Sequence, residues 1–248
     1  MLRLGSAVNH LAIGASHAVI VNTDNRPAIW EMVVVHRVFR REFRLAPELV
    51  RQVAPGDTER AATLASYLSE MLTGLHHHHE AEDKLLWPVL LGRVRLESDL
   101  IHTMEEQHER VAGHIGALAE LLPAWRAEAD ADRRDRLADT LLELHDELIV
   151  HLDQEEERIL PLVAEHLTKA EWDTLSEYAR AQLPKDRLLI QLGALLEDAT
   201  PWEREAFLAL MPMAARVLWR LVGQRQYRRE CQKVRRRTLG VFHASKHT

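Results

Sequence analysis

The chain lacks most of the features that build disulfide scaffolds, thiolate metal sites and membrane spans. Its 248 residues include one cysteine, Cys231, which excludes a disulfide framework and a metal cage built from thiolates. Ten glycines and nine prolines are too few for a loop-rich all-β protein. No apolar run approaches the roughly 20 residues that cross a bilayer, because Pro212, Arg216 and Arg220 interrupt the best one, residues 206–222.

The first residues also lack a regular pattern. Residues 1–25 show no clear period, and Asn9, His10 and Gly14 interrupt any apolar block, so we expect a flexible N-terminal arm and no signal peptide. The chain is 46% hydrophobic, which is enough for a well-buried core in a protein of this length. We therefore expect a soluble cytoplasmic protein with one large domain or two small ones.

Charge is distributed unevenly along the chain. The formal net charge is −6, but residues 216–248 hold ten of the 32 basic side chains and only one of the 38 acidic ones. This basic tail therefore carries +9 and the preceding residues carry −15. An acidic body disfavours specific nucleic-acid binding. The tail, with Arg235, Arg236 and Arg237 after an apolar segment, could instead touch an anionic surface or pack on the acidic body.

Beyond residue 25 the apolar spacing is helical, and no useful stretch alternates with a period of two. The spacing predicts an all-α fold with long helices over residues 28–53, 58–91, 98–127 and 133–166. Thr168 and Thr200, each followed after three residues by glutamate, form capping boxes that begin further helices. We predict a bundle with a following fifth helix over residues 26–184 and a helical C-terminal extension over residues 185–248.

Each of the four long helices carries histidine on its apolar stripe. Steps of three and four residues keep a stripe on one face of its helix. The ionisable members of the stripes are His36, His78, Glu82, His108, His151 and Glu155. The apolar members after the glutamates are Leu85 and Val89 in the second helix and Ile159 and Leu162 in the fourth.

Ionisable side chains on a buried stripe are costly unless they are paired or bound to a metal. A single histidine on an apolar face is usually a satisfied core residue. Four histidines and two glutamates distributed over four stripes instead indicate a shared polar centre. Because a cation would offset their combined desolvation cost, we predict that these six side chains bind metal.

An internal repeat sharpens this prediction. Both His78 and His151 are followed by glutamate after four residues and by proline after ten. The separation of 42 residues between the first two stripe histidines is matched by 43 between the last two. The first helix pair therefore looks like a copy of the second. Two pairs related by a pseudo-two-fold axis would each present two histidines and one glutamate, which suits two metals bridged by the glutamates.

The pattern His36, His78-x-x-x-Glu82, His108, His151-x-x-x-Glu155 resembles that of hemerythrin-like (HHE cation-binding) proteins, over roughly residues 28–184. The resemblance implies an up-and-down four-helix bundle that holds a non-haem di-iron centre, with two iron ions joined by an oxo or hydroxo bridge. Members of the family bind oxygen, sense oxygen or iron, or act on peroxide and nitric oxide. The segment beyond Pro184 resembles extensions of some actinobacterial members.

The chain departs from the oxygen-carrying hemerythrins, which have two histidines four residues apart on the third helix. Here methionine and alanine stand four residues to either side of His108. Four histidines and two bridging carboxylates offer eight metal bonds, whereas two six-coordinate irons need roughly twelve. Water, oxide, peroxide or another side chain must fill the gap. His79 is the first candidate, with Glu80 and Asp83 behind it.

The remaining histidines have plainer interpretations, and other metal chemistries fit less well. We expect surface or outer positions for His76, His77, His102, His114 and His145. A ferritin-like site needs Glu-x-x-His on two helices, and only one stripe histidine has it. A zinc hydrolase needs three protein ligands and an open position, which the symmetric ligand set disfavours.

Three classes of function follow from this pattern. The first is a di-iron protein that reacts with hydrogen peroxide or dioxygen, as in catalase-like peroxide detoxification under oxidative stress; the incomplete ligand set favours it. The second is an oxygen, nitric oxide or iron sensor or store, with residues 185–248 as its output element. The third is an interaction bundle whose polar centre is a hydrogen-bond network. The oligomeric state is left open.

Overall fold

The computed structural model describes residues 26–94 and 96–235. Within these ranges every regular element is helical, and the predicted all-α class is confirmed. The elements are α1 (Trp30–Arg51), α2 (Thr58–Ala81), η1 (Glu82–Leu86), α3 (Trp87–Arg93), α4 (Ser98–Glu128), α5 (Ala131–Gln154), η2 (Glu155–Ile159), α6 (Leu160–His166), α7 (Lys169–Ala181), α8 (Leu188–Glu197), α9 (Pro201–Ala209), α10 (Met213–Leu218), η3 (Trp219–Gly223) and α11 (Gln224–Val234). The predicted N-terminal arm, residues 1–25, lies outside the described residues.

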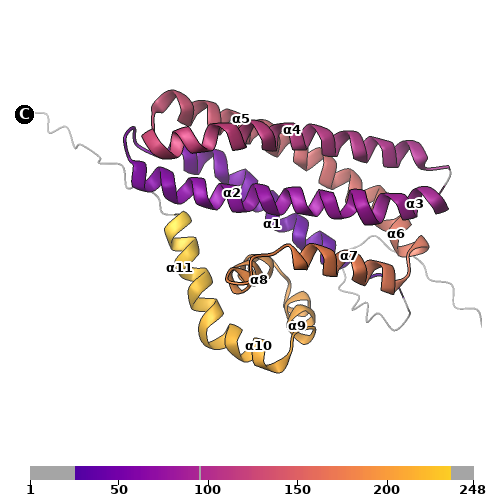
Figure 1. The fold of residues 1–248 in the computed structure, drawn as a ribbon. Coiled ribbons are helices and arrows are strands. Elements are labelled where there is room, and N and C mark those ends of the chain that lie inside the picture. Colours follow the sequence, from indigo (N-terminus) through magenta and orange to yellow (C-terminus); the bar gives the residue numbers. More distant parts are fainter. Residues whose placement is uncertain (1–25, 95, 236–248) are drawn as a thin grey trace, which may run out of the picture.

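Helices α1, α2, α4 and α5 form a four-helix bundle (Figure 1). Helix α1 packs on α2 and α5, and α4 packs on the same two, so helices that follow one another in the chain are neighbours in space. The predicted helices 28–53 and 98–127 match α1 and α4 to within two residues at each end. None of the described helices is both long enough and apolar enough to cross a bilayer.

Two apolar clusters fill the bundle, one toward each end. On α1, Met32 belongs to one cluster and Phe39 to the other. On α4, the same division falls between Met104 and Val111. In both helices the stripe histidine lies between the two members. The polar side chains therefore form a layer across the middle of the bundle, with apolar packing above and below it.

The second and fourth helices are interrupted by π turns, η1 and η2, which begin at Glu82 and Glu155. In each turn the N–H of a residue donates to the carbonyl of the glutamate five positions earlier. Pro88 and Pro161 stand two residues after the last residue of each turn. Since proline lacks the N–H that would bond the carbonyl four residues back, the paired prolines explain why both helices leave the α geometry here.

The π turns correct the stripe prediction. Each turn inserts an extra residue into the helix, so the face that points inward moves by one position. The affected stripe residues are Leu85, Val89 and Leu162, which are half-buried. Their next neighbours Leu86, Leu90 and Val163 are the buried ones, at most 1% exposed. An α period extrapolated through the glutamates could not foresee this shift.

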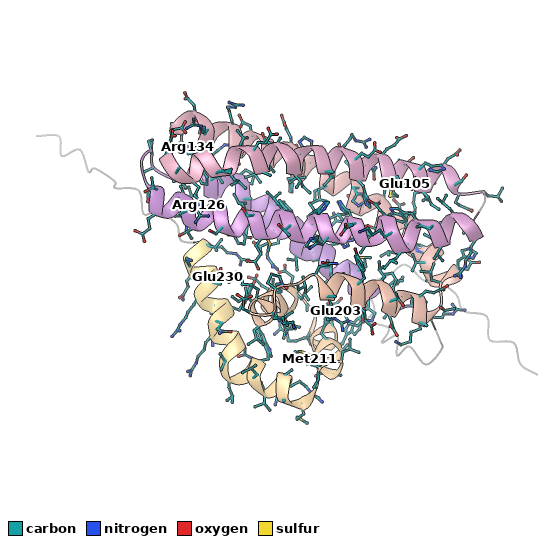
Figure 2. The ribbon with its side chains drawn as sticks, in the orientation of Figure 1. Glu105, Arg126, Arg134, Glu203, Met211 and Glu230 are labelled. Atoms are coloured by element: carbon teal, nitrogen blue, oxygen red, sulfur yellow. The ribbon has the colours of Figure 1, made fainter. Side chains whose placement is uncertain are left out.

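The chain after the bundle forms an arc of shorter helices on one side of it (Figure 1). Helices α7 and α9 begin at the capping boxes of Thr168 and Thr200, as predicted. Helix α8 contacts α1, and α11 contacts α2 and α8. Side chains fill the space between the arc and the bundle, with Glu203 among them (Figure 2). Trp219 and Leu196 belong to a small apolar core within the arc.

Candidate metal centre

Seven polar side chains from the four bundle helices meet in the layer between the apolar clusters. They comprise the six predicted ligands and the additional candidate, and each is at most 8% exposed. The set is His36, His78, His79, Glu82, His108, His151 and Glu155. The structure thus brings together every side chain that the sequence pattern selected.

The seven side chains divide into two overlapping groups. Within each group the nitrogen and oxygen atoms that could bind a metal lie within 4.8 Å of one another. The first group is His36, His78, Glu82 and Glu155, and the second is His79, Glu82, His108 and His151. Because Glu82 belongs to both groups, two cations held here would be adjacent and would share its carboxylate.

Each carboxylate lies between histidines of different helix pairs. Glu82 places Oε1 3.3 Å from His78 Nε2 and Oε2 3.5 Å from His108 Nε2. Its counterpart in the second repeat, Glu155, uses a single oxygen. The nitrogens nearest to Glu155 Oε2 are His36 Nε2 at 3.3 Å and His151 Nε2 at 3.7 Å.

The atoms that face the middle of the layer are unpartnered. The Nε2 atoms of all five histidines and both oxygens of Glu82 and Glu155 are buried, with no hydrogen-bond partner among the described residues. Leaving one buried polar group unsatisfied costs about 1–3 kcal/mol, and nine such atoms gather here. Imidazole nitrogen and carboxylate oxygen are ligands of first-row metal ions. The residues present therefore fit bound metal.

The opposite ring nitrogens of three histidines are held by acceptors outside the layer. His36 Nδ1 lies 2.9 Å from Glu156 Oε1, His108 Nδ1 lies 2.6 Å from Asp83 Oδ1, and His151 Nδ1 lies 3.0 Å from Gln107 Oε1. Ionised carboxylate and amide oxygens only accept, so each Nδ1 carries the proton and donates it. This tautomer leaves the Nε2 lone pair directed inward, as in metal-bound histidines.

Burial shifts the ionisation of the site in the direction that metal binding needs. Desolvation, with the nearby imidazoles, holds the pKa of His78, His79 and His151 well below the usual value. Desolvation also raises the pKa of Glu82 well above the usual range, and the charges of Glu155 and Asp83 add to it. These three imidazoles are thus neutral, which is the form that binds metal, while the carboxyl of Glu82 favours its proton until a cation replaces it.

The sequence model of the Hemerythrin HHE cation binding domain matches residues 28–182. The chain belongs to this hemerythrin family. The match covers the four bundle helices and α7. Searches of the curated proteins and of the solved structures gave no match. Membership of a cation-binding family agrees with the two groups of buried ligand-type side chains.

His79 is the one member of the centre that the repeat does not duplicate. Aligning the two copies places His79 opposite Leu152, which is a fully buried core residue. Both positions follow a stripe leucine by four residues, at the spacing that keeps a side chain on one helix face. That spacing was visible in the sequence, but it does not single out His79, because the exposed His76 also follows a leucine, Leu72, by four residues.

The other polar side chains near the predicted ligands lie outside the layer. Glu80 accepts from Lys84 on the surface at 2.7 Å, and Asp83 reaches the centre only through His108. Among the remaining histidines, His102 pairs with a neighbouring glutamate in the exposed part of α4. His145 likewise pairs with an adjacent aspartate, and His76 is exposed.

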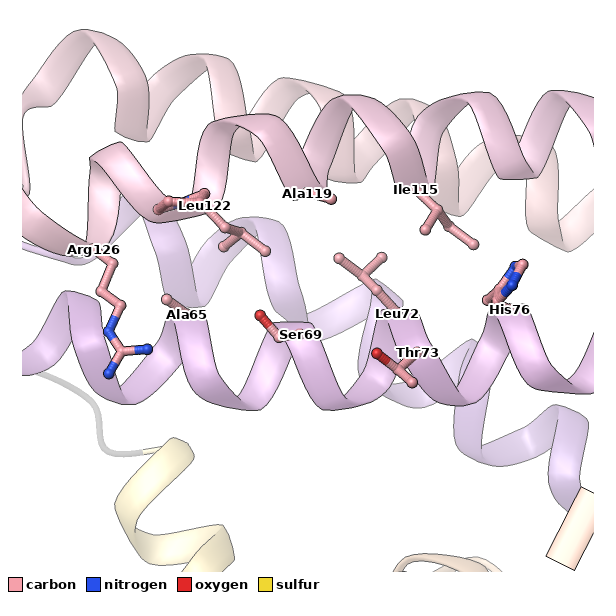
Figure 3. A pocket seen from close by; sticks show the side chains of 10 residues that line it. Ala65, Ser69, Leu72, Thr73, His76, Ile115, Ala119, Leu122 and Arg126 are labelled. Carbon is pink, nitrogen blue, oxygen red and sulfur yellow. The ribbon is translucent and has the colours of Figure 1, made fainter. Parts of the chain in front are cut away.

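A surface hollow of about 400 Å³ lies between α2 and α4 (Figure 3). It is lined by Leu72, Ile115 and Leu122, with His76 and Arg126 at its ends. None of the seven side chains of the centre borders it. The hollow is therefore not the site of the metal chemistry.

Proposed function

We propose that the protein is a non-haem di-iron protein that reacts with hydrogen peroxide or dioxygen, with catalase-like removal of peroxide as its activity. The observation that carries this proposal is the pair of ligand groups that share Glu82. Two adjacent irons would together supply or accept two electrons by cycling between the ferrous and ferric states. That is the number of electrons that one peroxide molecule exchanges.

The proposed reaction balances over two peroxide molecules. One molecule accepts two electrons and two protons, its O–O bond breaks, and two water molecules form. The other loses two electrons and two protons and leaves as dioxygen. The site residues would bind the irons through the five Nε2 atoms and the two carboxylates, and they would hold the imidazoles in a fixed tautomer through Asp83, Gln107 and Glu156.

The ligand count leaves room for a small molecule. Five imidazole nitrogens and four carboxylate oxygens make nine possible metal bonds, fewer than the roughly twelve of two six-coordinate ions. The fifth histidine, His79, thus adds one metal bond to the eight that four histidines and two carboxylates would provide, and about three positions are left for other ligands. Each group offers four side chains, two histidines with two glutamates in one and three histidines with one glutamate in the other. Both metals would therefore keep open positions.

Burial limits which substrates can reach the centre. His36, Glu82, His151 and Glu155 are fully buried, and the most exposed member, His78, is 8% exposed. The Phe39 ring also covers His78, at 5.2 Å between ring centroids. Molecules the size of peroxide, dioxygen or nitric oxide fit such surroundings, whereas larger organic substrates do not. The proposal is therefore restricted to small diatomic and peroxidic ligands.

A second function, ligand sensing without turnover, is favoured by the position of α1. This helix presents His36 to the centre, and its neighbouring residues hold the extension. Arg37 donates to Asp198 O at 2.9 Å and to Glu203 Oε2 at 3.0 Å. Arg41 donates to Ala194 O at 3.1 Å. A movement of α1 on ligand binding would therefore reach α8 and α9 directly.

One set of measurements on the full chain separates these functions. Iron-loaded protein with two irons per chain should evolve oxygen from hydrogen peroxide. His79→Ala should lower the iron content, whereas the matched variant His76→Ala, on the surface of the same helix, should retain it. Two bound irons without oxygen evolution would exclude the catalase-like activity. A stable dioxygen or nitric oxide adduct, together with altered protease sensitivity of the extension, would then establish sensing. Absence of stoichiometric metal would exclude both.

A further inference from the structure

Exposed apolar side chains are concentrated in one short stretch of the extension. Of the ten large apolar side chains that are exposed in the described part of the chain, six lie within residues 210–222. They are Leu210, Met213, Val217, Leu218, Leu221 and Val222, and three of them are 66–68% exposed. Leu210 lies in the turn before α10, and the other five, in α10 and η3, recur at spacings of three and four residues, as on one side of a helix. We refer to these six residues as the apolar stripe.

The apolar stripe lies where the rest of the protein does not cover it. It begins at the turn between α9 and α10, and α10 continues directly into η3 as one helical segment. Figures 1 and 2 show this corner, marked by Met211, on the side of the arc away from the bundle. The inner side of the same segment carries Trp219, which is buried in the core of the arc. The segment thus has one packed face and one unpartnered face.

Basic side chains continue the unpartnered face along η3 and α11. Residues 206–229 contain no acidic side chain. Arg220, Arg225, Arg228 and Arg229 are exposed and form no ion pair within residues 26–94 and 96–235. The first acidic residue after them, Glu230, is turned inward and accepts from Arg187 at 2.8 Å. The outward charge of α11 is therefore positive.

Arg235, directly after α11, is already bound by acidic residues of the bundle and of α8. Arg235 donates to Glu42 at 2.7 Å and to Glu197 at 2.6 Å. This residue therefore packs on the acidic body, while Arg236 and Arg237 lie outside the described residues. Arg220, Arg225, Arg228 and Arg229 are exposed.

We infer that this face binds the surface of an anionic lipid bilayer. An interfacial helix buries an apolar side about 5–10 Å into the headgroup region and directs arginines to anionic headgroups. The apolar stripe and the four arginines provide both components side by side. A nucleic acid would match the arginines but offer nothing to six exposed aliphatic side chains. A second copy of the chain, whose body is acidic, would match the arginines but leave the stripe to find an apolar partner.

The test uses the full chain and sedimentation with vesicles. Binding is expected to vesicles of equal parts phosphatidylglycerol and phosphatidylcholine, to weaken as salt increases, and to be absent from pure phosphatidylcholine. The double variant Met213→Glu and Leu221→Glu should lose binding, because it puts charge on the apolar stripe. Leu142→Glu, at a 43% exposed position of α5, is the matched control and should bind normally.

A second pair of variants tests the charges. Arg225→Gln with Arg229→Gln should weaken binding about 25-fold, since each basic residue at an anionic surface contributes about fivefold. Arg136→Gln, exposed on α5, should change nothing. All of these positions are exposed, so unchanged melting temperatures are expected. The inference is overturned if neither vesicle binds, if both bind equally, or if the variants on the stripe bind as the parent does. Self-association that the stripe variants abolish without any lipid binding would assign the face to a second copy.

Discussion

The imidazole of His108 is held from outside the metal centre by a single carboxylate. Asp83 accepts from its Nδ1 at 2.6 Å, and Asp83 is fixed in turn by the indole N–H of Trp87 at 2.9 Å. Glu156 plays the same part for His36, with Arg40 as its second donor. Because these partners orient the ring and set its tautomer, they contribute to metal affinity without touching the metal.

Removing Asp83 should therefore weaken metal binding while the fold persists. Asp83→Ala is expected to lower metal affinity roughly 10–100-fold, and the matched variant Glu80→Ala, whose carboxylate bonds Lys84 on the surface, should leave it unchanged. Competition with a chromophoric chelator measures both. Equal affinities in the two variants would show that the contact between Asp83 and His108 does not matter.

The raised pKa of Glu82 makes a prediction about the metal-free protein. A carboxyl whose folded-state pKa is raised contributes less and less stability as the pH rises from its ordinary value toward the raised one. Glu82→Gln keeps the shape without the charge, so it should stabilise the metal-free protein at neutral pH, by an amount that shrinks on acidification. With metal bound, the parent should be the more stable. Thermal unfolding with and without metal shows which of the two proteins is more stable in each condition. The prediction is contradicted if the same protein is the more stable one in both conditions.

The side chains of the centre were largely predictable from the sequence, because ionisable residues on apolar stripes are rare and costly. The supporting contacts were not. Gln107 lies on α4, and its Oε1 is 3.0 Å from His151 Nδ1 on α5. No local sequence pattern predicts a contact between residues that are so far apart in the chain. His79 was identified as an additional candidate, but its inward direction follows from the helix packing.

At the scale of the element, the two π turns decide which side chains are buried beyond the centre. The paired prolines were visible in the sequence, and they marked a repeat. Their effect on the hydrogen bonds was not visible, because hydrophobic periodicity records only which face is apolar. The helix boundaries, the capping boxes and the long helices were predictable, since each depends on residues close together in the chain.

The register shift can be tested with one pair of substitutions. Leu86→Ala removes a side chain that is 1% exposed and should destabilise the protein by about 2–5 kcal/mol. Leu85→Ala, the position favoured by an uninterrupted α period, removes a half-buried side chain and should cost about 1 kcal/mol or less. Urea unfolding of the two variants gives the comparison. A larger loss of unfolding free energy for Leu85→Ala than for Leu86→Ala would instead indicate an uninterrupted α-helix.

At the scale of the whole molecule, a network of charged groups joins the extension to the bundle. Glu197 of α8 accepts from Tyr227 of α11 and from Arg235, the residue that follows α11, and Nε of Arg41 in α1 lies 3.3 Å from Glu197 Oε2. Burial alone would raise the pKa of Glu197, but the hydrogen bonds from Arg235 and Tyr227 lower it to about 2 from an ordinary 4.5. The sequence predicted helices here but left open whether the basic tail packs on the acidic body or touches an anionic surface, since these ion pairs connect residues far apart in the chain.

This lowered pKa gives the docking of α11 a defined dependence on pH. Its contribution is complete above about pH 4.5 and is lost as the pH falls toward about 2. Hydrogen exchange in α11, corrected for intrinsic rates, should accelerate over that interval in the parent. Glu197→Gln should show fast exchange already at neutral pH, and Glu205→Gln, exposed on α9, should behave as the parent. Identical pH profiles of hydrogen exchange in all three proteins would show that Glu197 does not stabilise the docking of α11.

Two of the contacts that orient histidines of the centre run between the two repeats. Asp83 of the first repeat orients His108 of the second, and Glu156 of the second orients His36 of the first. Neither half of the chain would assemble this arrangement from its own side chains. A polypeptide of half the length could build it only by pairing with another such polypeptide, and two fragments divided between α3 and α4 would each require the other. Interdependence of this kind ties the two repeats to a shared evolutionary fate.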